Sequence, residues 1–162
     1  MKGVYRIVLG TAMLASLPVS AQEQAARMAD GYAHLNGFGE GVAAVLMRSS
    51  PVKRTRSVQG FNGMVVLKTY RQPGIALTTM SARNGPWPAS LTISRTGYPL
   101  PLGLHIGDKR GAVEDVLGAP ATGGDTLVLK RTQGDGCDDP IVLSFRNKVL
   151  TQAAWTWESC MD

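Results

Sequence analysis

Short apolar segments recur in the same order in the two halves of the chain. Each half has one segment with helical spacing followed by three segments that alternate like strands, and a proline, Pro51 or Pro120, follows each helical segment. The pattern predicts helices at 42–46 and 109–117 and strands at 64–70, 74–80, 90–96, 127–130, 141–145 and 149–157. We therefore predict an α+β fold of two tandem α-β-β-β repeats, 36–98 and 102–162, forming one antiparallel sheet with helices on one face.

The first residues predict a secretion signal rather than part of the fold. Lys2 and Arg6 give a basic start, an apolar stretch too short to span a bilayer follows, and small residues ending at Ala21 form a cleavage site. Residues 1–21 are thus predicted to be removed. The remainder, 22–162, is predicted to be a single soluble domain in a bacterial periplasm, without a transmembrane anchor.

Alternation along the strands divides their residues between two faces of the sheet. The face predicted to be covered by the helices carries Val65, Leu67, Ile75, Leu77, Leu91, Ile93, Leu127, Leu129, Ile141, Leu143, Phe145, Trp155 and Trp157. The opposite face is a candidate platform for a protein partner, with the binding residues Lys68, Tyr70, Thr78, Thr92, Ser94, Lys130, Ser144, Gln152 and Thr156. Two alternatives stay open: this face is only the solvated side of the sheet, or Trp155 and Trp157 form an exposed binding stripe.

The two cysteines lie on either side of a predicted hairpin. Asn147 and Lys148 form its tight turn, so residues whose numbers sum to about 295 should face each other. The residue numbers of Cys137 and Cys160 come close to that sum, and one bulge in the hairpin accounts for the difference. We predict a disulfide between them in an oxidising compartment, in preference to a reactive thiol, because neither lies in a CxxC motif or beside a histidine.

The start of the second repeat resembles a known repeat in its turn, cap and core positions. These positions are Gly103, Leu104, Gly107, Asp108, Val113, Leu117, Gly118 and Pro120. Asp108 is predicted to cap the helix and Gly118 to end it in a left-handed conformation. The pattern is similar to the repeat of the SmpA/OmlA outer-membrane assembly lipoproteins and of β-lactamase-inhibitory protein. That resemblance implies this fold and binding to other proteins, without catalysis; the first repeat departs from it at 47–50, where the glycine before the proline is missing.

Candidate chemistry for an enzyme is sparse. His34 and His105 lie in no metal-ligand pattern, and no serine lies in a nucleophile elbow. The glycine-rich stretch 36–41 follows no strand and lacks the Lys-Ser/Thr of a phosphate loop, so it is predicted to be a plain break after a helix at 23–34. The aspartates around Cys137 lack the spacing of a calcium loop. We predict no catalytic residues, metal or cofactor.

Charge adds little to the choice of partner. The formal net charge of +5 includes Lys2 and Arg6 of the predicted signal, so the exported chain is nearly balanced and a nucleic-acid partner is not expected. A basic run, Arg48, Lys53, Arg54 and Arg56, is predicted to form a loop that either is solvated or touches the cell envelope. Two function classes follow: a periplasmic protein-binding module, such as an inhibitor of a secreted hydrolase or toxin, or an envelope-assembly or structural accessory protein.

Overall fold

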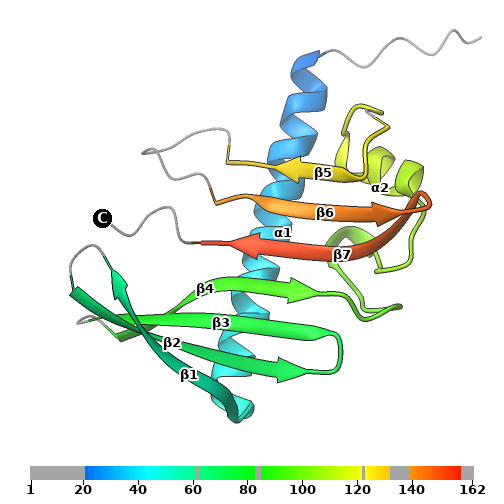
Figure 1. The fold of residues 1–162 in the computed structure, drawn as a ribbon. Coiled ribbons are helices and arrows are strands. Elements are labelled where there is room, and N and C mark those ends of the chain that lie inside the picture. The colour runs from blue at the N-terminus through cyan, green and yellow to red at the C-terminus, as the bar shows by residue number, and fades with distance from the viewer. Residues whose placement is uncertain (1–20, 61–62, 83–84, 122, 132–138, 158–162) are drawn as a thin grey trace, which may run out of the picture.

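The computed structural model describes residues 21–60, 63–82, 85–121, 123–131 and 139–157 (Figure 1). Their elements are α1 (Ala21–Ser49), β1 (Val52–Gly60), β2 (Gly63–Gln72), β3 (Ile75–Ala82), β4 (Gly85–Ile93), the 3-10 turn η1 (Pro101–Gly103), α2 (Arg110–Leu117), β5 (Thr126–Leu129), β6 (Ile141–Arg146) and β7 (Val149–Thr156). The fold is α+β, as the sequence predicts. Cys137, Cys160 and the predicted signal before residue 21 lie outside the described residues, so the disulfide and the signal stay predictions.

The strands of the described residues form one antiparallel sheet of seven, in the order β1-β2-β3-β4-β7-β6-β5. Strands β1 to β4 pair in sequence, β5 to β7 do the same, and the two groups join where β4 pairs with β7, with Leu91 opposite Trp155. We call β1–β4 the first half of the sheet and β5–β7 the second half.

Strand β1 is an element that the sequence pattern did not predict. The predicted basic loop is wrong here, because Lys53, Arg54 and Arg56 belong to this strand at the edge of the sheet. Its residues are mostly polar and exposed, so it has too little apolar alternation to reveal it. Charged side chains on an edge strand discourage pairing with other chains, which explains this composition.

Helix α1 runs without interruption through the predicted glycine-rich break, so that break is wrong. Two of the helix glycines serve packing instead. A Cβ on Gly39 would lie 2.7 Å from Nε1 of Trp155, and a Cβ on Gly31 would lie 2.7 Å from Cδ2 of Leu117. Only residues without side chains let α1 come this close to β7 and α2, and this packing outweighs the low helix propensity of glycine, about 1 kcal/mol per residue.

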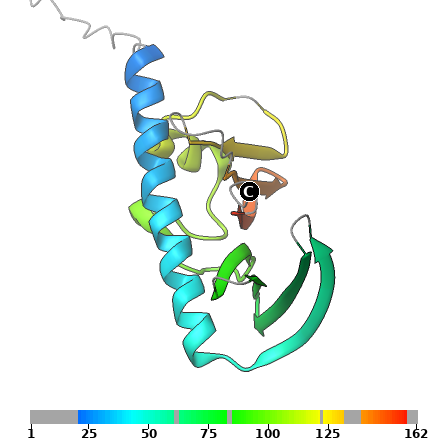
Figure 2. The same cartoon turned by 90° about the vertical axis from the view of Figure 1, so that its left-hand side faces the viewer.

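Figure 2 shows α1 along one side of the sheet, with β1 sweeping away from the end of the helix. Side chains far apart in the sequence hold α1 in place. The hydrogen bonds run from Trp155 Nε1 to Leu35 O (2.9 Å), from Trp157 Nε1 to Asn36 Oδ1 (2.9 Å) and from the Tyr32 hydroxyl to Asp139 O (3.0 Å). The indoles of Trp155 in β7 and of Trp157 just after it therefore belong to the interior, and the alternative of an exposed tryptophan stripe is wrong.

The core lies between α1 and the sheet. The predicted core residues of β3 to β7 are all buried, namely Ile75, Leu77, Leu91, Ile93, Leu127, Leu129, Ile141, Leu143, Phe145, Trp155 and Trp157. The segment between β4 and α2 adds Leu104 and Ile106, and α2 adds Val113 and Leu117. Val65 and Leu67 are only half-buried, so the predicted face assignment fails on β2.

The hairpin of β6 and β7 confirms the predicted turn. Asn147 and Lys148 both have positive φ, 52° and 61°, as a two-residue turn between twisted strands requires. Arg146 faces Val149 in the predicted register, and a bulge beyond Phe145 then shifts the pairing by one residue.

Helix α2 begins at Arg110 and ends at Leu117, and the φ of 64° at the next residue, Gly118, confirms the predicted left-handed end. The predicted cap is wrong: Asp108 Oδ2 accepts the backbone N–H of His105 at 2.7 Å, and no side chain caps the helix. A buried ion pair follows, in which Arg110 Nε donates to Glu114 at 2.6 Å while the guanidinium lies 5.0 Å from the centre of the Phe145 ring.

Candidate functional site

Five of the predicted binding residues share the face of the sheet that points away from α1, which we call the open face. Each of these residues is next to a buried core residue along its strand, so its side chain points to the opposite face of the sheet. The cross-strand pairs are Thr78 with Ser90, Ser90 with Thr156, Thr92 with Ala154, and Ser144 with Gln152. All of these side chains are half-buried. They form a shallow platform of hydroxyl and methyl groups.

Two other predicted residues lie just beyond strand ends. Strand β4 ends at Ile93, so Ser94 follows it, and its N–H donates to Gly74 O at 2.7 Å. Lys130 follows β5 and is exposed. Both lie at the margin of the platform rather than within it.

The predicted anchors Lys68 and Tyr70 are on the wrong face. Tyr70 pairs directly with the buried Leu77 and is itself only 7% exposed, and Lys68 pairs with the buried Thr79. Strand β2 carries apolar residues on both faces, so alternation alone does not tell which face is covered. The pairing with β3 decides it, because directly opposed residues of antiparallel strands share a face.

The same register brings Leu67 to the open face, where it starts a row that the sequence did not reveal. Arg56 pairs with Leu67, Leu67 pairs with Met80, and Met80 pairs with Trp87. The row crosses β1, β2, β3 and β4 in direct register. Trp87 was missed because β4 begins at Gly85, earlier than the predicted strand.

Neighbouring positions extend this row into a patch. Val58 pairs with Val65 on the same side as Leu67, and both are half-buried. We call the five residues Val58, Val65, Leu67, Met80 and Trp87 the apolar corner. Tryptophan, methionine and arginine are enriched at the centres of protein interfaces, so the apolar corner with Arg56 at its edge has the composition of a binding surface.

The part of the chain that contains the apolar corner differs from the rest in its charge. Residues 41–107 contain no Asp or Glu, so all 12 acidic residues lie outside them. Their basic residues are Arg48, Lys53, Arg54, Arg56, Lys68, Arg71, Arg83 and Arg95. The nearly balanced total charge hides this asymmetry, which is the one sequence signal that points to the first half of the sheet. A positive field of this kind attracts anionic partners.

Side chains with catalytic chemistry do not gather in the described part of the chain. His34 lies 3.6 Å from Asp30, and His105 lies 3.9 Å from Asp108, each pair on the surface. No group of three His, Cys, Asp or Glu side chains within the described residues is placed to hold a metal ion. Burial raises the pKa of the Tyr32 hydroxyl, with a smaller contribution from the charge of Asp139.

Among the described helices, none is long and apolar enough to cross a membrane. Comparison of the chain with protein-family models, with curated proteins and with solved structures gave no match. The functional argument therefore depends on the geometry and charge of the molecule itself.

Proposed function

We propose that this chain is an exported periplasmic module that binds another protein through its open face, and that a secreted hydrolase or toxin is the class of partner it inhibits. The row of Arg56, Leu67, Met80 and Trp87 carries the proposal. The indole of Trp87 and the thioether of Met80 are half-buried on the side of the sheet away from the core. A partner that covers them buries the apolar area that is still exposed, which is worth about 25 cal/mol per Å².

The proposed architecture is that of two related α-β-β-β units closing on each other. The pairing of β4 with β7, the last strand of each predicted unit, supports it. The resemblance at residues 103–120 to the SmpA/OmlA and β-lactamase-inhibitory repeats is a second support, since members of both groups bind proteins. We propose no catalytic role for any residue.

A comparative capture experiment tests the open face. The chain, exported and immobilised, is exposed to periplasmic extract as wild type, as Leu67→Asp and as Val128→Asp. Val128 is the matched control, because it lies on the same face at the other end of the sheet and is 42% exposed. We expect a protein that wild type and Val128→Asp retain and Leu67→Asp loses, with all three folded at the temperature of the experiment. Equal capture by both variants contradicts the proposed interface.

The second candidate function is an envelope-assembly or structural accessory protein. The absence of acidic residues from 41–107 favours it, because anionic lipid and wall polymers attract such a surface. The dependence of binding on salt concentration distinguishes the two functions. Envelope association through Arg48, Lys53, Arg54 and Arg56 should fall away at moderate ionic strength, whereas a complex built on the apolar corner should persist.

A further inference from the structure

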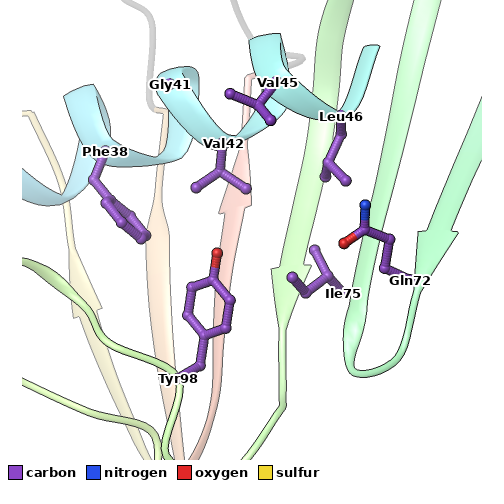
Figure 3. A pocket seen from close by; sticks show the side chains of 8 residues that line it. All are labelled: Phe38, Gly41, Val42, Val45, Leu46, Gln72, Ile75 and Tyr98. Atoms are coloured by element: carbon purple, nitrogen blue, oxygen red, sulfur yellow. The ribbon is translucent and has the colours of Figure 1, made fainter. Parts of the chain in front are cut away.

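A pocket lies between the C-terminal part of α1, the β2–β3 turn and the segment after β4, on the opposite side of the sheet from the open face (Figure 3). It has a volume of about 440 Å³. Its walls are formed by Phe38, Gly41, Val42, Val45, Leu46, Gln72, Ile75 and Tyr98. We call it the α1 pocket. Small-molecule sites in proteins commonly have volumes of about 300–1,000 Å³, so this pocket can hold a ligand.

The walls of the α1 pocket are apolar apart from two groups. In Figure 3 the Tyr98 hydroxyl points toward Val42, and the Gln72 amide points toward Leu46. Gln72 Nε2 donates to Ser50 Oγ at 2.9 Å, so its orientation is held. Val45 is 54% exposed, which makes the apolar wall accessible from solvent. Mostly apolar walls with a few oriented polar groups are typical of sites for amphiphilic ligands.

The surroundings of the pocket are cationic. Arg48 Nε donates to Ala44 O at 3.2 Å, which holds its guanidinium back along the helix beside the turn that carries Val45. Arg95 lies against the β2–β3 turn, since a Cβ on Gly74 would be 2.6 Å from the Arg95 Cβ. The acidic residue nearest along α1, Glu40, does not line the pocket, and its carboxylate accepts a hydrogen bond from Asn36 Nδ2 at 2.8 Å. With no Asp or Glu in 41–107, the local field favours an anion.

We propose that the α1 pocket binds a monomeric anionic amphiphile, with its hydrocarbon chain between α1 and β3 and its anionic head near Arg48 and Arg95. Apolar burial supplies the affinity for the chain, and the two guanidiniums select the charge of the head. The site is independent of the open face, because the two lie on opposite sides of the sheet.

Three probes with the same alkyl chain and different heads test the charge selection. Dodecanoate, dodecyltrimethylammonium and dodecyl maltoside are titrated below their micelle concentrations into the purified exported protein, with calorimetric detection. We expect dodecanoate to bind at least about tenfold more tightly than the other two, a difference of about 1.4 kcal/mol. Equal binding of all three, or no binding of dodecanoate, overturns the proposal.

A matched pair of glycine variants locates the site. A Cβ on Gly41 or on Gly37 meets nothing within 4 Å, so a side chain fits at either position, but only Gly41 lines the pocket. Gly41→Leu should fill the pocket and weaken dodecanoate binding at least about tenfold, while Gly37→Leu leaves it unchanged. Neither should lower the melting temperature. Equal affinity of the two variants for dodecanoate places the amphiphile elsewhere and overturns the proposal.

Surface variants give a second test that does not touch the walls. Arg48→Gln with Arg95→Gln should remove the preference for dodecanoate and leave the affinity for dodecyl maltoside unchanged. A preference that survives this double change overturns the assignment of the head group. So does cosedimentation with anionic phospholipid vesicles in the absence of any dodecanoate binding, because a membrane surface is then the ligand.

Discussion

Both halves of the sheet bury apolar side chains in the core. They differ in how closely α1 covers them and in the side chains that they present on the open face. Helix α1 packs tightly on the second half through Gly39 against Trp155, and on α2 through Gly31 against Leu117. Over the first half it leaves the α1 pocket beside Gly41 and Ile75. The first half also carries the apolar corner and the acid-free span 41–107. Helix α1 therefore covers the second half more closely, and the features suited to binding lie in the first half.

The open face shows the same contrast in its side chains. The first half has Leu67, Met80 and Trp87 on this face, whereas the second half has Ser144 and Gln152 beside the smaller apolar side chains of Val128 and Val142. Since both halves fold against the same helix, the difference is not required by the core. It separates residues that stabilise the protein from residues that are available to a partner, and the following changes test that separation.

The largest expected effect is on stability, from Trp155→Ala. This indole is 1% exposed and bonded to α1, so its loss should lower the free energy of unfolding by about 3–5 kcal/mol. Trp87→Ala on the open face should lower it far less. Urea denaturation of both variants measures the difference. Similar losses for the two tryptophans would contradict the distinction between the faces.

The next effect is on binding. For a partner captured through the open face, Trp87→Ala should weaken the complex by at least about 2 kcal/mol, as the loss of a central aromatic anchor does. Val128→Ala in the second half should change affinity little. Surface plasmon resonance with the purified partner compares the two, and a larger effect of Val128→Ala moves the binding centre to the second half.

A pair of helix glycines tests how closely α1 lies on each half. Gly39→Ala places a methyl group 2.7 Å from the buried Trp155 indole, and overpacking of this kind costs about 1–3 kcal/mol, which exceeds the gain in helix propensity. Gly41→Ala meets no neighbour and should stabilise the helix by up to about 1 kcal/mol. Thermal and urea unfolding give both values. Stabilisation by both substitutions would mean that α1 is packed loosely on both halves.

The smallest effect depends on pH. Burial raises the pKa of Tyr32 above its ordinary value of 10.0, so the folded protein keeps this proton where the unfolded chain loses it. Stability from this group is therefore present below pH 10 and is lost as the pH rises further. Tyr32→Phe should reduce the fall in the free energy of unfolding between about pH 9 and pH 11. If the free energy of unfolding falls as steeply with pH in the variant as in wild type, other groups cause the loss of stability at alkaline pH.

The strands were predictable wherever apolar alternation and turn residues agreed. Asn147 and Lys148 marked their hairpin because a tight turn needs residues that accept positive φ. Strand β1 could not be found this way, since an exposed edge strand has no apolar face. Gly39 was misinterpreted because it makes room for the Trp155 indole, which is remote in the sequence. The hydrogen bond from the same indole to Leu35 O spans 120 residues.

The candidate site was predicted in part. Thr78, Thr92 and Thr156 do share the open face, because their strands have one clearly apolar side. Lys68 and Tyr70 were placed wrongly because β2 is apolar on both sides, and only its pairing with β3 orients it. The acid-free span was visible in the sequence, and local charge is a better guide than the total charge to the half that we propose binds a partner.

The hydrogen bonds between the first helix and residues 139–157 also set the order in which the molecule can assemble. The contacts of Tyr32, Trp155 and Trp157 span 107, 120 and 121 residues, so the interior stays incomplete until residues 139–157 have been made. Such non-local closure makes folding slow relative to folds with local contacts. For a chain with a predicted export signal this delay is useful, because translocation of an unfolded polypeptide requires that it not fold while it is still being synthesised.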